Sequence, residues 1–319
     1  HDGPLPRYAG LNAPAWAILN GEDTHGVTWH ALASGVDQGT IYVQRMFDIA
    51  PDETALMLNT KCFEAGIGSF AELLDGIERG TLAGRLQDLA ERSYFGRKLR
   101  PEAAATLRFD QSAPSLERLV RALDFGAGYA NPLVTPKLRA ENGLYAVTRL
   151  TATGEAPHGA PGSVMSVSPE GVLIAAADAA VLVEASRIGD GEPLWTALRP
   201  GTVLPRMDEA FSRGLTEAVA EAAGHETEMR AAIAAAQDID LIDMKPWTAG
   251  QAADVAAIPL DLPRGLDRDA RAAAVAAFVL RLTGQAEASL AFSSQAARAR
   301  AATFPGYFSD VYPLNLAAA

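Results

Sequence analysis

The chain has very little cysteine, since Cys62 is the only one among 319 residues. A single cysteine excludes an intrachain disulfide framework and a zinc site built from several thiolates. We therefore expect no metal site. The low thiol content fits a reducing compartment, and we expect the cytoplasm.

Basic residues are also in deficit, with 27 Lys and Arg against 39 Asp and Glu and a net charge of −12. Binding to nucleic-acid phosphates needs clustered cations, and anionic membrane surfaces repel an acidic protein. No apolar run reaches the ~18 residues that a membrane-spanning helix requires. We expect neither a nucleic-acid partner nor a membrane partner.

Short β-rich runs and amphipathic stretches alternate over the first eighty residues, which is typical of a mixed α/β unit. The expected strands are 26–30 and 40–44, and the expected helices are 11–20, 51–66 and 69–79, the last ending at Gly80. A polar connector, 81–105, follows.

The second half begins with an amphipathic helix at 113–122, and several short strands after it predict a small barrel or sheet. These strands are 144–150, 162–167, 171–176 and 180–188. An acidic, Ala-rich stretch at 207–243 is expected to be a helical linker. The elements expected after it are a strand at 256–260, a helix at 268–282 ending at Gly284, and strands at 289–292 and 310–316.

Two residues stand out as candidates for proton transfer. His1 carries the side chain best suited to acid–base chemistry near neutral pH. Asp37 lies in a loop flanked by Gly35 and Gly39, where it could orient an imidazole and stabilise its cation. No catalytic role is expected for the other candidates. His25 is expected in a turn, Cys62 as a small apolar residue that fills space on a helix, and Asp110 in a structural role. His158 and His225 are expected to be exposed.

Three segments resemble signatures of the 10-formyltetrahydrofolate-dependent formyltransferases. His1-Asp2-Gly3-Pro4-Leu5-Pro6-Arg7-Tyr8-Ala9-Gly10 resembles H-x-S-x-L-P-x-y-x-G, 25–30 resembles H-G-x-T-x-H, and 35–41 resembles G-x-D-x-G-x-I. Gly3 stands where many members have Ser, a departure expected to leave the catalytic residues untouched. The resemblance implies an enzyme whose co-substrate is 10-formyltetrahydrofolate. The implied residues are His1 and Asp37 for catalysis, Leu5, Pro6, Gly35, Val36 and Asp37 for cofactor binding, and Thr28 and His30 in support.

The resemblance also implies a domain map. Residues 1–95 would be the C-terminal half of a Rossmann-like catalytic domain, 106–205 a small β-rich domain similar to an oligonucleotide-binding fold, and 206–244 the linker. Residues 245–319 resemble part of an α/β condensation domain of a nonribosomal peptide synthetase, without its paired histidines. We expect both chain ends to be cuts in a longer polypeptide. The family's catalytic Asn would then precede His1 by two positions, and the chain alone would be a weak enzyme.

The function implied is formyl transfer to an amine. The acceptor would be a small molecule, such as an amino acid, or an aminoacyl group on a carrier protein, with downstream synthetase domains as partners. Two alternatives stay open: a hydrolase of formyltetrahydrofolate, and a non-catalytic interface module of a peptide synthetase. Formate release without an amine would favour the first, and partner binding without turnover the second.

Overall fold

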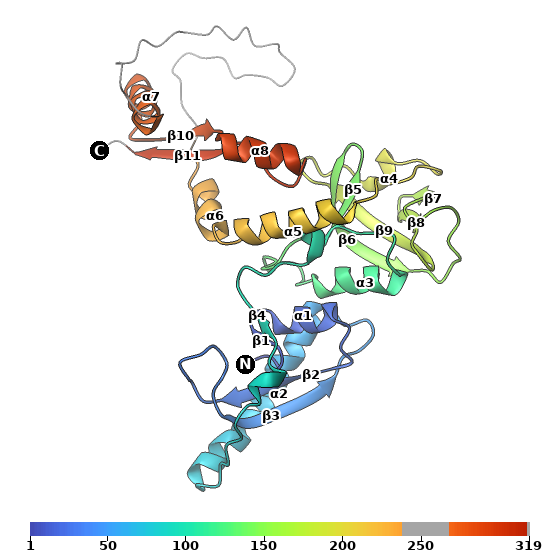
Figure 1. Ribbon diagram of the computed structural model, residues 1–319, viewed down its shortest axis with the longest axis vertical. Helices are drawn as coiled ribbons and strands as arrows, with labels where there is room; N and C mark the ends of the chain where they lie inside the picture. Colours follow the sequence, from blue (N-terminus) through green and yellow to red (C-terminus); the bar gives the residue numbers. More distant parts are fainter. Residues whose placement is uncertain (238–267, 318–319) are drawn as a thin grey trace. The chain divides into compact units, whose positions relative to one another are not determined.

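The computed structural model describes residues 1–237 and 268–317, which divide into two compact units at residues 224 and 225 (Figure 1). Both units mix helices and strands, so the expected α/β class is confirmed. The strand expected at 256–260 lies outside the described residues. None of the helices in the described ranges is long and apolar enough to cross a membrane.

The first part of unit 1 is built around a two-stranded ladder. β2 (Thr24–His30) and β3 (Ile41–Asp48) are antiparallel, and α2 (Ala55–Glu78) packs against both strands (Figure 1). The ladder is irregular at one end, because Trp29 pairs with Val43 whereas His30 pairs with Ile41. β3 therefore carries one extra residue, Tyr42, where the chain enters the 31–40 loop.

Three short elements complete this part of unit 1. α1 (Ala13–Leu19) confirms the helix expected at 11–20, and its apolar side chains are buried against α2 and α3. β1 (Ala9–Gly10) pairs in parallel with β4 (Tyr94–Phe95), which belongs to the connector at 81–105. The connector is therefore not only a polar link, because it returns the chain to the segment that follows His1.

The structure corrects the expectation of two helices at 51–66 and 69–79, because α2 is one helix of 24 residues. Gly66 and Gly68 suggested a break, but an added Cβ at either position would meet nothing within 4 Å. Glycine costs a helix only about 1 kcal/mol relative to alanine. Ser69 offsets that cost, since its buried hydroxyl donates to the Ala65 carbonyl oxygen at 2.7 Å and accepts from the Trp29 indole nitrogen at 2.9 Å.

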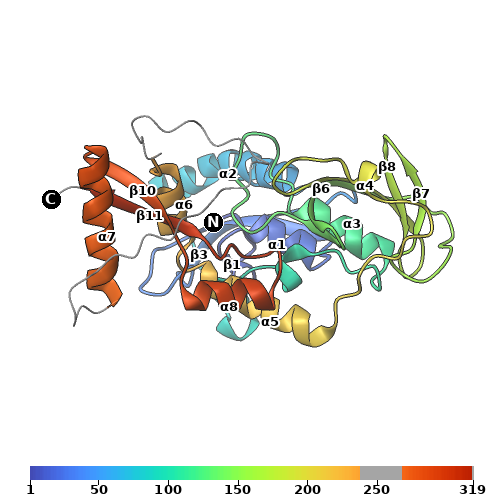
Figure 2. The same cartoon turned by 90° about the horizontal axis from the view of Figure 1, so that it is seen from above.

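The second part of unit 1 is an open antiparallel sheet covered by α3 (Ala113–Ala122), which confirms the helix expected there. The Ser112 hydroxyl caps α3, and Leu116 and Val120 enter the same core as the sheet. The strand order is β5-β6-β9-β8-β7, and Figure 2 shows β7 and β8 side by side. The strands are β5 (Lys137–Ala140), β6 (Gly143–Ala152), β7 (Val164–Ser168), β8 (Gly171–Ala175) and β9 (Ala180–Arg187).

The four strands expected after α3 are thus confirmed, and β5 is an addition that the sequence did not suggest. The likeness to an oligonucleotide-binding fold stays a prediction. Short helical pieces accompany the sheet and the connector: η1 (Leu89–Glu91), η2 (Glu102–Ala105) and α4 (Leu194–Ala197).

The acidic stretch at 207–243 is helical where it is described, as α5 (Glu209–Ala222) and α6 (Glu226–Ala234). α5 is packed rather than solvated on all sides, because Leu215 is fully buried. It also contacts η2, where the Thr216 hydroxyl accepts a hydrogen bond from the Ala103 amide at 2.9 Å. The proposed domain boundaries themselves stay a prediction.

Unit 2 contains α6 and a hairpin of β10 (Glu287–Phe292) and β11 (Tyr312–Ala317), against which α7 (Arg268–Thr283) packs. α8 (Gln295–Thr303) lies between the two strands in sequence. The helix expected at 268–282 is confirmed, and it ends before Gly284, whose φ of 67° suits glycine. Both expected strands are confirmed as well.

Candidate active site

The main chain of His1 is tied to β2. The Thr28 amide donates to the His1 carbonyl oxygen at 2.9 Å, and the amino nitrogen of His1 donates to the Thr28 carbonyl oxygen at 3.0 Å. The His1 side chain is only 7% exposed. His1 is therefore held at the edge of the ladder and is not a loose end of the chain.

Thr28 fixes the loop that carries His1. Its hydroxyl donates to the Gly3 carbonyl oxygen at 2.7 Å, and it accepts from the Leu5 amide at 3.2 Å and from the Gln44 amide nitrogen at 2.9 Å. The same Gln44 nitrogen donates to the Leu5 carbonyl oxygen at 2.9 Å. Thr28 is 1% exposed, and its expected supporting role stays a prediction.

Leu5 and Pro6 are both buried in this loop, and Leu5 is 1% exposed. Their expected role in cofactor binding stays a prediction. Their surroundings place them in the interior of the loop, where they shape the path of the chain between His1 and β1.

Gly3 lies against the His1 ring, and the expectation that this departure leaves the catalytic residues untouched stays a prediction. His1 Nε2 lies 2.8 Å from the Tyr8 carbonyl oxygen. A Cβ at Gly3 would lie 2.8 Å from the same ring nitrogen and 2.9 Å from the same oxygen. A side chain at position 3 would therefore displace this contact.

The Asp37 carboxylate lies between two imidazole rings. Its Oδ2 atom is 3.6 Å from His1 Nδ1, and its Oδ1 atom is 3.6 Å from His30 Nε2. These are ion-pair distances, longer than hydrogen bonds. Asp37 has a positive φ of 54°, and its Oδ2 atom accepts a hydrogen bond from the Gly10 amide at 2.8 Å. The structure thus brings together three residues that the sequence singled out.

Each imidazole has one nitrogen at a carbonyl oxygen and the other toward Asp37. For His1 the carbonyl is that of Tyr8, and for His30 it is that of Ala31, 2.8 Å from Nδ1. A carbonyl oxygen only accepts, so the nitrogen beside it carries a proton. A second proton on either ring would face the Asp37 carboxylate. The arrangement can therefore accept and return a proton.

Two residues of the connector hold the 35–39 loop, and sequence reasoning missed both. The Gln87 side-chain nitrogen donates to the carbonyl oxygens of Asp37 and Gly39, at 2.9 and 2.6 Å. Arg92 Nη2 donates to the Val36 carbonyl oxygen at 3.0 Å. The sequence carries no local signal for these contacts, because the partners are about fifty residues apart.

His25 was expected in a turn, but it lies in β2 and is fully buried. Its ring packs edge-on against Tyr8 and Phe47, and its Nε2 atom lies 2.8 Å from the Asp2 carbonyl oxygen. Nδ1 has no partner among the described residues. Burial lowers the pKa of His25, because a charged ring would lose its hydration.

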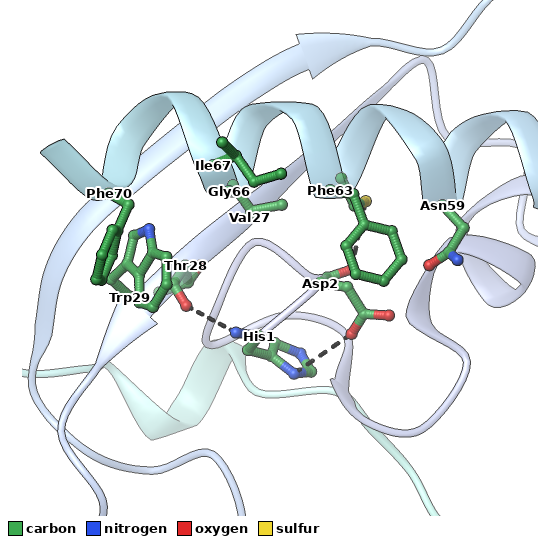
Figure 3. A pocket seen from close by; sticks show the side chains of 11 residues that line it. His1, Asp2, Val27, Thr28, Trp29, Asn59, Phe63, Gly66, Ile67 and Phe70 are labelled. Atoms are coloured by element: carbon green, nitrogen blue, oxygen red, sulfur yellow. Dashed lines mark hydrogen bonds and ion pairs between the residues drawn. The ribbon is translucent and has the colours of Figure 1, made fainter.

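A cavity of about 560 Å³ lies between α2 and β2, beside His1 (Figure 3). Its polar lining includes His1 and Asp2, whose Oδ1 atom is 3.6 Å from His1 Nδ1. Cys62 also lines it, and burial raises the pKa of this thiol to about 12. The thiol is therefore inert, as expected of a filler. The remaining lining residues are Val27, Thr28, Trp29, Asn59, Phe63, Gly66, Ile67 and Phe70.

The other residues considered from the sequence lie apart from this site. His158 and His225 are exposed, and Asp110 forms ion pairs with Arg108 and Arg206 at 3.6 and 3.5 Å. These observations agree with the structural roles expected for them. Within 1–237 and 268–317, no three His, Cys, Asp or Glu side chains gather as metal ligands would.

Two segments of the chain match known families. Residues 1–73 match the family described as "Formyl transferase", and residues 99–197 match "Formyl transferase, C-terminal domain". His1, Thr28, His30 and Asp37 all lie in the first segment. The chain therefore carries two formyltransferase-type segments in the order expected from the sequence.

Several solved structures, two of them described as N-formyltransferases, are similar to this chain at a low level. An N-formyltransferase from Helicobacter canadensis, crystallised with folinic acid and dTDP-3-aminofucose, is 22% identical over 58% of this chain and 64% of its own, with a TM-score of 0.47. WlaRD, a sugar 3N-formyltransferase, is 23% identical over 60% and 64%, with a TM-score of 0.47. A variant of HypX from Aquifex aeolicus is 24% identical over 59% and 32%, with a TM-score of 0.46. The chain thus spans less than two thirds of each.

Proposed function

We propose that this chain contributes the acid–base residues for formyl transfer from 10-formyltetrahydrofolate to an amine. The observation that carries the proposal is the Asp37 carboxylate between His1 and His30, 3.6 Å from each ring, in the segment that matches the formyl transferase family. The folate compounds crystallised with similar proteins agree with this choice of donor.

The co-substrate supplies the formyl group, which moves from its N10 nitrogen to the amine. During transfer the amine loses one proton, N10 gains one, and negative charge develops on the formyl oxygen. A protonated His1 stabilises that charge electrostatically, since its two ring nitrogens already face the Tyr8 carbonyl oxygen and the Asp37 carboxylate. Asp37 stabilises the imidazolium and keeps its ring oriented while the proton passes from the amine to N10.

The 35–39 loop supports the prediction that part of the folate binds there. Val36 is 54% exposed and Gly35 is half-buried, so their backbone is accessible beside Asp37. Leu5 and Pro6 lack that accessibility. We therefore assign Gly35, Val36 and Asp37 to contact with the co-substrate, and Leu5 and Pro6 to shaping the loop that carries His1.

The proposal also concerns the chemical class of the amine that accepts the formyl group. An amino acid, or an aminoacyl group on a carrier protein, follows from the resemblance of 245–319 to a synthetase segment. One structurally similar protein has been crystallised with dTDP-3-aminofucose, an amino-sugar nucleotide and thus an amine of a different class. A panel containing both classes separates these possibilities.

The experiment uses the protein in its full natural length. It is incubated with 10-formyltetrahydrofolate and amines of each class, and mass spectrometry follows formylated amine, formate and tetrahydrofolate. We expect amine-dependent formation of a formylated product, with an Asp37→Asn variant as the inactive reference. Formate without formylated amine would favour the hydrolase, and no turnover with retained partner binding would favour the interface module.

A further inference from the structure

We propose that Gln87 is a positioning residue that holds the 35–39 loop and keeps the Asp37 carboxylate between His1 and His30. The proposal rests on the proposed function, because Asp37 is the residue through which Gln87 acts. It concerns a side chain in the connector that touches neither imidazole ring.

The 35–39 loop needs external support to hold its conformation. Asp37 has a φ of 54°, a region that costs a non-glycine residue roughly 1–3 kcal/mol and persists only where the surroundings impose it. The loop has little packing of its own, because Val36 is 54% exposed and Gln38 is exposed as well. Contacts from outside the loop must therefore hold Asp37 in place.

Gln87 provides the most direct of these contacts. One nitrogen serves the carbonyl oxygens of both Asp37 and Gly39, at 2.9 and 2.6 Å. Carbonyl oxygens accept only, so the amide must turn its nitrogen toward the loop. The Oε1 atom is buried and has no partner among the described residues. The contact thus depends on the amide as a double donor.

The segment around Gln87 is itself anchored at both ends. Arg85 and Ile41 exchange two main-chain hydrogen bonds, each 2.8 Å long, at the start of β3. Further along, β4 pairs with β1, and Gly10 of β1 donates to Asp37 Oδ2 at 2.8 Å. One segment of the connector therefore holds the backbone of Asp37 through Gln87 and its carboxylate through Gly10.

Arg92 adds a contact to the same loop but is a less selective probe. Its Nη2 atom donates to the Val36 carbonyl oxygen, and its guanidinium lies 4.7 Å from the centre of the Tyr94 ring. Replacing Arg92 would disturb that ring in β4 as well as the loop. Gln87 is therefore the residue whose loss tests the support of Asp37 most cleanly.

The experiment compares Gln87→Ala with Gln87→Lys in the full-length protein. Alanine removes both donors, whereas lysine restores hydrogen-bond donors at the end of a long side chain. The matched control is Gln295→Ala, which removes an exposed side-chain amide in α8, outside this loop. We measure kcat and KM for formyl transfer, thermal melting, and amide hydrogen exchange at Gly10 and in residues 35–39.

We expect Gln87→Ala to lower kcat roughly 10- to 100-fold, because small misplacements of catalytic groups have effects of this size. Exchange at Gly10 should accelerate roughly tenfold, which corresponds to the loss of about one hydrogen bond. Gln87→Lys should recover most of both values. Gln295→Ala should behave as the wild-type protein, and melting should differ little among the variants.

Unchanged kcat in Gln87→Ala, or lowered kcat with unchanged exchange at Gly10 and in the loop, would overturn the proposal. Hydrogen exchange does not depend on knowing the reaction. If the wild-type protein transferred no formyl group, the proposed function would be wrong. The exchange data would still show whether Gln87 holds Asp37.

Discussion

The Gly10 amide donates a hydrogen bond to Asp37 Oδ2 at 2.8 Å, so a residue of β1 orients the carboxylate of a loop that follows β2. Hydrogen bonds to a charged acceptor are stronger than those between neutral groups. The same oxygen lies 3.6 Å from His1 Nδ1. The direction in which Asp37 faces His1 is thus set by the main chain.

Replacing Asp37 with asparagine should lower turnover by roughly 10²-fold or more, the usual contribution of a group that assists proton transfer. The amide is nearly the same size and tolerates a positive φ, but it cannot stabilise an imidazolium. Melting temperature and formyl transfer are the measurements. Asp110→Asn, in a carboxylate that pairs with Arg108 and Arg206 apart from this site, is the matched control and should keep full activity. Near-normal turnover of Asp37→Asn would show that the assignment is wrong.

Replacing Gly3 with alanine should impair the site more than it destabilises the fold. The new Cβ would lie 2.8 Å from His1 Nε2, so the ring must move away from the Tyr8 carbonyl oxygen. Turnover and melting are compared with those of Gly68→Ala, which adds a methyl in α2 where nothing lies within 4 Å. The control should raise stability by up to about 1 kcal/mol, because alanine favours the helix. A fully active Gly3→Ala enzyme would mean that the position of the His1 ring matters little.

The protein should lose stability as the pH falls below about 6.5, the ordinary pKa of histidine. Burial lowers the pKa of His25 in the folded protein, so between its two pKa values only the unfolded chain takes up the proton. Neutral His25 thus contributes stability above the unfolded pKa, and that stability is lost on acidification. Denaturant unfolding at pH 7.5 and pH 5 measures the effect.

In that experiment His25→Gln should flatten the dependence on pH, since the amide can still donate to the Asp2 carbonyl oxygen but does not titrate. His158→Gln, at an exposed position, should leave the dependence unchanged. If His25→Gln retained the full loss of stability at low pH, another group would be responsible.

Cys62 should resist alkylation in the folded protein. Burial raises the pKa of its thiol to about 12. At pH 8 the reactive thiolate would therefore be roughly 10³-fold rarer than in an ordinary cysteine. Labelling with iodoacetamide before and after unfolding in guanidinium measures the difference. Rapid labelling of the folded protein would indicate that α2 separates from the segment bearing Asp2.

Local patterns predicted the elements whose causes are local. α3 was found from its apolar face, and Ser112 caps it in the structure. α7 was found from its pattern and from Gly284, where the backbone has a positive φ. The ends and the apolar faces of both helices depend on residues within a few positions of one another. A local pattern in the sequence is therefore enough to predict them.

The features that the sequence did not predict depend on contacts between distant residues. Gly66 and Gly68 look like a helix end, but Ser69 holds α2 to Trp29, forty residues earlier. His25 looks like a turn residue before Gly26, but rings from two other elements enclose it. Gln87 looks like one polar residue of a connector. Its function depends on the carbonyl groups that the fold brings to it.

His1 and Asp37 were found for a different reason. Neither spacing nor composition joins residues 36 positions apart, and it was the resemblance to a family signature that paired them. The ion-pair distance between them and the place of His30 on the other side of the carboxylate came only from the structure.

Because β3 carries one extra residue, the number of residues where β3 meets the 31–40 segment is itself constrained. Trp29 pairs with Val43 and His30 with Ile41, so removing one residue would straighten the strand and redirect the side chains where it meets the loop. Exposed residues of the 31–40 segment such as Leu32 can change while the ends of the segment stay joined by the bond from the Ala31 amide to the Thr40 carbonyl oxygen, 2.9 Å long. Insertions and deletions here should therefore be tolerated far less well than substitutions at such exposed positions.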